Sequence, residues 1–94
     1  MKRGFFLIAY DIRQDKRRLK VARLFESLGC RVQGSVFEAH LTDAELKQVR
    51  QQVRKLINEE QDSLRIYPLC RVCQNHVIII GQGSLTKAPE VIII

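Results

Sequence analysis

The sequence has few of the features that mark membrane, secreted or disulfide-rich proteins. Its 94 residues contain no apolar run near the roughly 20 residues that a membrane span needs. The apolar run at 5–10 is too short for a signal-peptide core, and no small-residue cleavage site follows it. The three cysteines are an odd number, which argues against a secreted disulfide scaffold. These absences predict a cytoplasmic protein with no membrane partner and with reduced thiols.

Aromatic residues and repeats are also scarce. Aromatic side chains make up 6% of the chain, and the predicted strands carry few of them. Single-strand RNA binders built on a sheet stack bases on strand aromatics, so the sequence disfavours a plain RNA-binding module of that kind. A toxin-like ribonuclease stays open as a further alternative. The chain shows no internal repeat and no low-complexity segment.

The chain instead carries an excess of positive charge. Sixteen Lys and Arg against ten Asp and Glu give a net charge of +6 and a pI near 9.7. That balance favours a polyanionic partner, although solubility alone is a simpler explanation. The hydrophobic fraction of 46% is typical of a globular domain. A domain of this size buries only about 60–65% of its unfolded surface, so we expect association into a dimer to add stability.

Hydrophobic periodicity predicts strands alternating with helices. The run FFLIAY at 5–10 predicts a strand that is buried on both faces or central in a sheet. The helix that follows has an apolar face, is opened by Gln14 or Asp15, and is closed by Gly29 as a C-cap. Residues 31–41 predict either one strand or a tight hairpin that turns near Gly34.

The second half of the chain adds a helix and further strands. TDAE at 42–45 is a capping box, and it opens a second amphipathic helix. SLRIYPL at 63–69 predicts a strand at or near a sheet edge, because Pro68 cannot donate a ladder hydrogen bond. The runs HVIII at 76–80 and VIII at 91–94 predict two more strands.

This order predicts an α+β fold, a ferredoxin-like (βαββαβ) sandwich. We expect residues 1–83 to form the domain. The last apolar run would promote aggregation if it stayed exposed. We therefore expect residues 84–94 to form a loop and strand exchanged with, or packed on, the partner of a homodimer.

Three stretches of the chain resemble a known protein family. They are YDI with the charged run after it, GCRVQGSVF, and DSLRIYPLC. In this order and spacing, over about residues 5–83, they resemble the small universal CRISPR-associated adaptation protein, the Cas-two family. The resemblance implies a ferredoxin-like homodimer in which a C-terminal strand of each protomer extends the partner's sheet. It also implies a magnesium-dependent endonuclease or endoribonuclease that acts on RNA or double-stranded DNA during spacer acquisition. The alternative it allows is a non-catalytic scaffold that binds duplex DNA and bridges subunits of the CRISPR integrase.

The resemblance also implies the residues of a site. Asp11, preceded by Tyr10, matches the family's acid at the end of the first strand. In a symmetric dimer the two copies of this catalytic acid would hold Mg²⁺ or another divalent cation. Ser35 and Phe37 match the S-V-F signature, and we expect them with Tyr10 at the cleft or dimer interface. From the residues alone, a role for Asp11 in ending the strand is the simpler interpretation.

Two basic surfaces are candidates for phosphate binding. The resemblance places Arg18 and Arg31 near the active-site cleft, and the charged run adds Arg17 and Lys20 as nucleic-acid-binding candidates. Most such runs are solvated helix faces, so the simpler interpretation stays open. The second helix carries another basic face, made of Lys47, Arg50, Arg54 and Lys55.

The cysteines Cys70 and Cys73 form one half of a zinc-ligand pattern, with His76 nearby. A single C-x-x-C is a weak signal for zinc. A thioredoxin-like role is disfavoured because no strand-to-helix turn is expected to carry the motif. The simplest expectation is two small, partly buried side chains in a loop.

Overall fold

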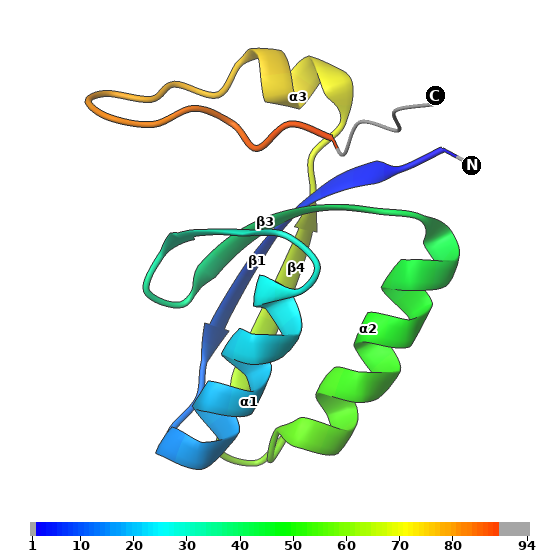
Figure 1. The fold of residues 1–94 in the computed structure, drawn as a ribbon, viewed down its shortest axis with the longest axis vertical. Coiled ribbons are helices and arrows are strands. Elements are labelled where there is room, and N and C mark those ends of the chain that lie inside the picture. Colours follow the sequence, from blue (N-terminus) through cyan, green and yellow to red (C-terminus); the bar gives the residue numbers. More distant parts are fainter. Residues whose placement is uncertain (1, 89–94) are drawn as a thin grey trace, which may run out of the picture.

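The structure is a computed structural model that describes residues 2–88. Four strands form one antiparallel sheet in the order β2-β3-β1-β4, so β1 is central, as the sequence predicts. Figure 1 shows the arrangement, which is the ferredoxin-like βαββαβ topology. The elements are β1 (Gly4–Asp11), α1 (Asp15–Glu26), β2 (Cys30–Gln33), β3 (Val36–Leu41), α2 (Asp43–Leu56), β4 (Ser63–Pro68) and α3 (Arg71–Asn75).

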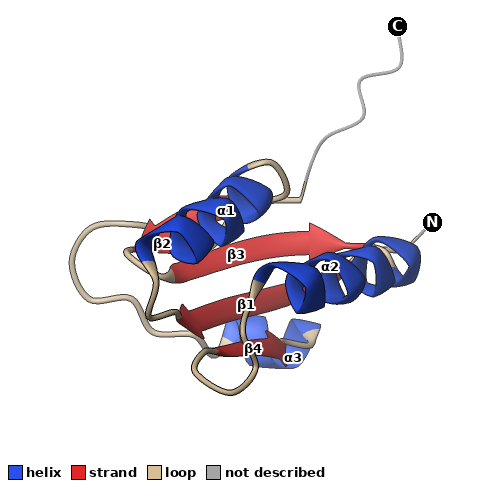
Figure 2. Cartoon of the chain, turned by 90° about the horizontal axis from the view of Figure 1, so that it is seen from below, coloured by secondary structure: helices blue, strands red, loops and turns tan. Residues whose placement is uncertain are grey.

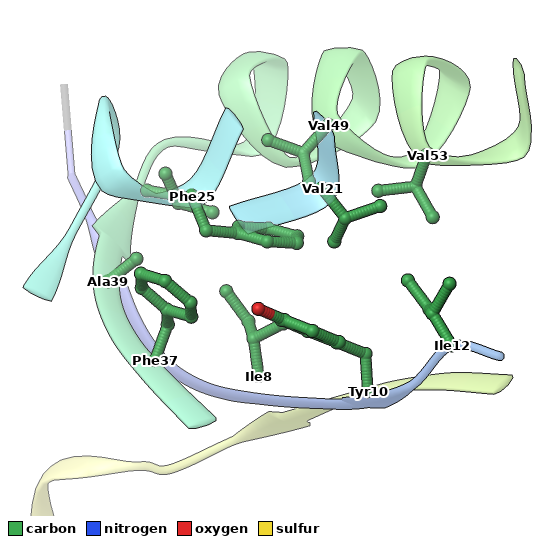
Figure 3. Packing of buried hydrophobic residues seen from close by; sticks show 10 residues of the cluster. Ile8, Tyr10, Ile12, Val21, Phe25, Phe37, Ala39, Val49 and Val53 are labelled. Carbon is green, nitrogen blue, oxygen red and sulfur yellow. The ribbon is translucent and has the colours of Figure 1, made fainter. Parts of the chain in front are cut away.

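The hydrophobic core lies between the sheet and the two long helices. Figure 2 shows α1 and α2 together over one face of the sheet. Alternate residues of β1 and β3 point toward the helices, because successive strand side chains face opposite sides. The largest fully buried side chains are Phe25, Phe37, Ile8, Leu41, Val21 and Val49. Figure 3 shows how helix and sheet residues meet in this layer.

Residues 30–41 form a hairpin rather than one strand. β2 and β3 pair antiparallel, and Gly34 and Ser35 make the connection. Gly34 has φ +22, a backbone conformation that glycine adopts at little cost. The register shifts between Arg31 and Gln33, so the ladder is irregular next to the turn.

Gly29 does not close α1, contrary to the sequence expectation. The C-cap is Ser27, which keeps a right-handed helical conformation, and Gly29 is not among the glycines with positive φ. A Cβ at Gly29 would lie 2.2 Å from the carbonyl oxygen of Glu38 and 2.9 Å from the Cβ of Ala39. The residue is a glycine because the chain passes directly against β3 at this point.

Two local sequence signals are confirmed. The Thr42 hydroxyl accepts a hydrogen bond from the Glu45 amide, and the Glu45 carboxylate accepts one from the Thr42 amide, which completes the capping box of α2. β4 pairs only with β1 among the described residues, so it is an edge strand. Pro68 is its last residue, where a missing donor matters least.

The strand predicted at 76–80 is absent from the described chain. Residues 71–75 form the short helix α3, which was not expected, and residues 77–80 have no regular structure. A strand needs a neighbour to pair with, and Figure 1 shows that the chain after α3 runs away from the sheet before it turns back. Ile78 and Ile80 are therefore 83% and 94% exposed. The strand expected at 91–94 lies outside the described residues.

The segment after this loop returns to the sheet face that α1 and α2 leave open. The Glu38 carboxylate accepts hydrogen bonds from the backbone amide and the hydroxyl of Thr86, at 3.0 and 2.8 Å. The carbonyl oxygen of Thr86 lies 2.8 Å from Nε2 of His40, whose ring packs on Phe5. The described part of residues 84–94 therefore contacts its own chain, and its exchange with a partner stays a prediction. Among residues 2–88, no helix has both the length and the apolar character needed to cross a membrane.

Candidate nuclease cleft

A cleft of about 610 Å³ lies where β1 ends and α1 begins. It is bounded by the end of β1, the first turns of α1 and the β2–β3 turn. Five of the residues singled out in the sequence line it together: Tyr10, Asp11, Arg18, Arg31 and Ser35. The fold thus brings residues 10–11, 18 and 31–35 into one concave surface.

Asp11 is the free acid of this cleft. It is the last residue of β1, it is exposed, and it takes part in none of the four ion pairs found between described residues. The next residue, Ile12, is buried in the core and anchors the end of the strand. The Asp11 backbone is therefore anchored, and no cation among the described residues pairs with its carboxylate.

Arg18 shapes the turn that presents Asp11. Its Nε and Nη2 donate hydrogen bonds to the carbonyl oxygen of Ile12, at 3.0 and 2.9 Å, and Nη1 pairs with Asp15 at 2.7 Å. Because these bonds span the β1–α1 connection, Arg18 fixes the backbone immediately after Asp11. Its guanidinium still borders the cleft and adds positive charge there.

Arg31 brings a second cation from the opposite wall. Its Nη2 pairs with Glu26 at 2.6 Å, and its Cζ lies 5.2 Å from the centre of the Phe37 ring. Both partners belong to neighbouring elements, so the guanidinium is held against α1 and β3. The side chain stays exposed and lines the cleft.

Tyr10 belongs to the core and to the cleft. Its ring packs against both Phe25 and Phe37, with ring centroids 6.4 and 6.2 Å away, and those two rings also contact each other, as Figure 3 shows. Burial raises the pKa of the Tyr10 phenol above its ordinary value, so the group stays protonated at neutral pH. The Tyr10 backbone amide donates to the carbonyl oxygen of Ser35 at 3.1 Å, which ties the hairpin turn to β1.

Phe37 is not at the cleft or interface position expected for it. The side chain is fully buried in the core of a single chain and leaves no surface for a partner. The reason is its parity on β3, which points it toward α1 with Ala39 and Leu41. Lys20 is exposed on α1 but does not line the cleft.

Arg17 is engaged in the structure rather than available to a ligand. Its Nε and Nη2 donate to the two carboxylate oxygens of Asp62, at 2.8 and 3.2 Å. Its Nη1 donates to Gln14, and Nη2 also donates to Gln61. With these four acceptors around it, the guanidinium has little capacity left for phosphate.

Asp62 is an anchoring residue that the sequence reasoning missed. Its carboxylate also accepts hydrogen bonds from the backbone amides of Arg13 and Asn58, at 3.0 and 2.9 Å. Arg17, together with these amides, holds the pKa of the Asp62 carboxyl well below its usual range. Asp62 thereby joins the β1–α1 turn to the α2–β4 turn. The quoted stretch DSLRIYPLC begins with Asp62, but no local pattern assigns this role to it.

The basic face of α2 differs from that of α1. Lys47, Arg50 and Arg54 recur three and four residues apart, so they share one side of the helix. Neither they nor Lys55 take part in an ion pair with any described residue. This face is therefore open to an anionic partner in a way that Arg17 is not.

The cysteines lie elsewhere than expected. All three are exposed, so Cys70 and Cys73 are not partly buried loop residues. Cys70 is the N-cap of α3 and follows β4 by two residues, so a strand-to-helix turn does carry the C-x-x-C motif.

The described residues of one chain do not complete a metal site. They contain no group of three or more His, Cys, Asp or Glu side chains placed to hold an ion. Asp11 nevertheless fits part of a magnesium site, because Mg²⁺ takes oxygen ligands and is often held by only one or two carboxylates and the substrate phosphate. The other carboxylate among the described residues that line this cleft, Asp15, is paired with Arg18.

Comparison with known proteins gives one consistent result. A family model described as CRISPR associated protein Cas2 matches residues 4–77. The chain is 46% identical over 87 residues to CRISPR-associated endoribonuclease Cas2 1 of Chloroflexus aurantiacus, covering 92% of this chain and 94% of that one. It is 42% identical to CRISPR-associated endonuclease Cas2 2 of Thermus thermophilus, covering 97% of both. A solved structure described as a partial Cas6-RT-Cas1–Cas2 complex contains a similar chain, with TM-score 0.77, 30% identity, and 97% and 99% coverage.

Proposed function

The chain belongs to the CRISPR-associated Cas2 family, and on that premise we propose that it is a metal-dependent phosphodiesterase of CRISPR adaptation whose site is assembled from two copies of the chain. The single observation that carries this proposal is the state of Asp11. It is an exposed carboxylate without an ion-pair partner among the described residues, and it stands in a cleft that also holds Arg18 and Arg31. Relatives that span nearly the same length are named endoribonuclease or endonuclease.

Asp11 is the residue that would hold the ion. When bound, a divalent cation such as Mg²⁺ supplies Lewis-acid stabilisation of negative charge on a phosphate oxygen. Asp11 contributes a carboxylate ligand, and Ser35 places a hydroxyl in the same cleft. Arg31 and Arg18 bring positive charge to the walls, where they favour an anionic backbone. The hydrogen bonds from Arg18 to the Ile12 carbonyl oxygen hold the backbone next to Asp11 in place.

Two surface features favour association with a second copy of the chain. β4 has an open edge among the described residues, and an open edge is a template for another strand. Val72, Ile78 and Ile80 are exposed apolar side chains on the segment that follows β4. Burying them against a partner would remove this apolar surface from water. A two-fold axis would then place two Asp11 carboxylates in one shared site.

Phosphate contacts are distributed differently from the basic run in the sequence. We assign them to Arg31 in the cleft and to Lys20 on the exposed face of α1, while Arg18, whose guanidinium already donates to Ile12, Arg13 and Asp15, adds positive charge at the cleft wall. Arg17 is the weakest candidate among these cations, because its guanidinium is held by Asp62. Such contacts give affinity without sequence information, so the substrate can be RNA or double-stranded DNA.

A second candidate function is a non-catalytic scaffold for the Cas1 integrase on duplex DNA. Its support is the similar chain found in a Cas1–Cas2 complex, together with the unpaired basic face of α2 among the described residues. The two functions are compatible, because the α2 face and the Asp11 cleft are made of different residues. The two functions differ in the role of Asp11, which is needed for cleavage but not for the scaffold.

The test compares wild type with Asp11→Asn on end-labelled RNA and duplex DNA, with Mg²⁺ and with EDTA. Asp15→Asn is the matched control, because Asp15 is an exposed carboxylate of the same cleft that already pairs with Arg18. We expect cleavage by Asp11→Asn to fall by more than about 100-fold, since even indirect supports of a metal ligand are worth about 10–100-fold. We expect Asp15→Asn to cut within a few-fold of wild type. Cleavage by Asp11→Asn at the wild-type rate, or cleavage that persists in EDTA, would refute a metal-dependent reaction at Asp11.

A mixing experiment tests the shared site directly. Wild type and Asp11→Asn are unfolded together at equal amounts and refolded, so that dimers form at random. If both carboxylates are needed, activity falls to about one quarter of that of the wild-type protein at the same total concentration. If each protomer works alone, activity falls only to about one half.

A further inference from the structure

The pair Cys70 and Cys73 lies at the end of the sheet that is remote from the Asp11 cleft. In the β1–β4 register Asp11 faces Ser63, whereas Phe6 faces Pro68, the last residue of β4. Five steps along β4 at about 3.4 Å each separate these ends by about 17 Å. The cysteines come directly after the far end and begin α3. They therefore form a cluster that the proposed nuclease does not use.

Cys70 and Cys73 lie one helical turn apart, in direct contact. Sγ of Cys70 accepts a hydrogen bond from the backbone amide of Cys73 at 3.5 Å. In one helical turn, Cα atoms three residues apart are about 5 Å apart. That separation lies inside the range of about 4.4–6.8 Å over which a disulfide forms without strain. Closing the pair requires little backbone movement.

The two thiols are chemically unequal. Hydrogen bonds from the Cys73 amide and thiol stabilise the thiolate of Cys70 and lower the pKa of that thiol below its ordinary value. The same contact raises the pKa of the Cys73 thiol. The thiolate is the nucleophile in exchange reactions, so Cys70 is the attacking group and Cys73 the one that follows. Both side chains are exposed, which gives a small molecule access to either.

Disulfide formation suits this pair of cysteines better than metal binding does. A structural zinc site takes four ligands, and the described residues add no third His, Cys, Asp or Glu to the pair. A disulfide needs only the two sulfurs that are present. The motif also follows a strand and opens a helix, the setting in which a C-x-x-C pair typically serves redox exchange.

We propose that Cys70 and Cys73 form a redox-active dithiol that exchanges with low-molecular-weight disulfides of the glutathione type. The Cys70 thiolate attacks one sulfur of the external disulfide, the S–S bond breaks, and one external thiolate leaves. Cys73 then loses its proton to solvent and attacks the Cys70 sulfur, which releases the second external thiolate. Each released thiolate takes up a proton. The protein pair is oxidised by two electrons, and the external disulfide is reduced to two thiols.

The experiment uses the full chain, fully reduced and then equilibrated without oxygen in buffers of glutathione and glutathione disulfide. Samples are quenched with acid, and intact mass and free thiols are measured. We expect the wild type to lose two of its three thiols and about 2 Da, with Cys70 and Cys73 joined in one peptide. Cys30→Ser is the matched control, because it removes an exposed cysteine outside the pair, and it should form the same disulfide.

Single variants test the order of attack. Cys73→Ser should accumulate a stable mixed disulfide on Cys70, because nothing displaces the glutathione. Cys70→Ser should react at Cys73 more slowly near pH 7 than Cys73→Ser reacts at Cys70, because only the Cys70 thiolate accepts the backbone-amide hydrogen bond. Serine is a favoured N-cap, so Cys70→Ser keeps an acceptor for the Cys73 amide and α3 stays formed.

Three results overturn the proposal. They are glutathione adducts on the wild type without an internal disulfide, disulfides between chains through Cys30, and equal adduct rates for the two single variants. Each readout is a mass or a thiol count, so none depends on whether the protein cleaves nucleic acid.

Discussion

Replacement of Gly29 separates two explanations for that glycine. If it were a helix C-cap in the left-handed region, Asn would serve nearly as well as Gly, and Ala would be only mildly unfavourable. The structure instead places a Cβ at this position 2.2 Å from the Glu38 carbonyl oxygen and 3.1 Å from the Ala39 Cα. Both obstacles are backbone atoms of β3, so no side-chain rotation relieves the clash. We therefore expect Gly29→Ala and Gly29→Asn to be strongly destabilising.

The size of the effect follows from the contact. Restoring an ordinary separation of 3.4 Å requires the chain at Gly29 and β3 to move apart by about 1.2 Å. Overpacking a close contact typically costs about 1–3 kcal/mol, and a contact against backbone belongs at the upper end. Ala also restricts the unfolded chain, which offsets about 0.4–1 kcal/mol. A net loss of about 2–3 kcal/mol corresponds to a Tm lower by about 10–20 °C for a domain of this size.

The assay is thermal and urea unfolding followed by circular dichroism. Gly34→Asn is the control, because Gly34 has positive φ, no atom would lie within 4 Å of a Cβ added there, and Asn tolerates such a turn. We expect the control to stay within about 1 kcal/mol of wild type. A Gly29→Ala variant of wild-type stability, or a Gly29→Asn variant more stable than Gly29→Ala, would show that the close approach to β3 is not what requires glycine. Because β2 follows directly, the same displacement should also move Arg31 in the cleft.

Three further predictions concern charge. Because the pKa of Asp62 is lowered in the folded protein, its ion pair stabilises the fold above the unfolded pKa of about 3.9, and this stabilisation is lost as the pH falls below that value. Asp62→Asn should therefore lower the free energy of unfolding at neutral pH and flatten the acid limb of a curve of stability against pH. An unchanged curve would contradict the pairing. Arg31→Gln should weaken nucleic-acid binding and reduce the slope of log affinity against log salt by about 0.9, whereas Arg17→Gln should lower Tm and leave that slope unchanged. Charge reversal of Arg50 and Arg54 should weaken duplex binding but leave magnesium-dependent cleavage of a short RNA within a few-fold of wild type. An equal loss of binding and of cleavage would show that the α2 face and the cleft act as one surface.

Sequence patterns succeeded where the determinant is local. Strand and helix periods, the capping box at Thr42 and Glu45, and the edge position of Pro68 all depend on residues close together in the chain. They were sufficient for the ferredoxin-like topology, because few arrangements bury the apolar faces of two helices and an antiparallel sheet. The prediction for 76–80 was wrong because an apolar β-branched run meets the sequence criteria for a strand, but pairing also requires a free neighbour.

The placement of Asp11 after a buried strand was visible in the sequence, and the resemblance to the Cas2 family assigned it a role. The sequence did not show which of the neighbouring Arg and Lys side chains lie beside Asp11. Arg17 and Arg18 are adjacent in a run of similar charges, yet Arg17 is bound by a carboxylate 45 residues away, and Arg18 by the carbonyl oxygen next to Asp11. The Arg17 pairing exists only when the fold brings two distant segments of the chain together.

The amino-acid sequence alone determined the order of the elements, the faces that they bury and the acid at the end of the first strand, because these follow from side-chain period and local hydrogen bonding. Tertiary structure decided the rest. It set Gly29 against β3, placed Phe37 in the core and paired Arg17 with Asp62. Each of these outcomes depends on a contact made across space, and such contacts exist only once the sheet and its helices are in place.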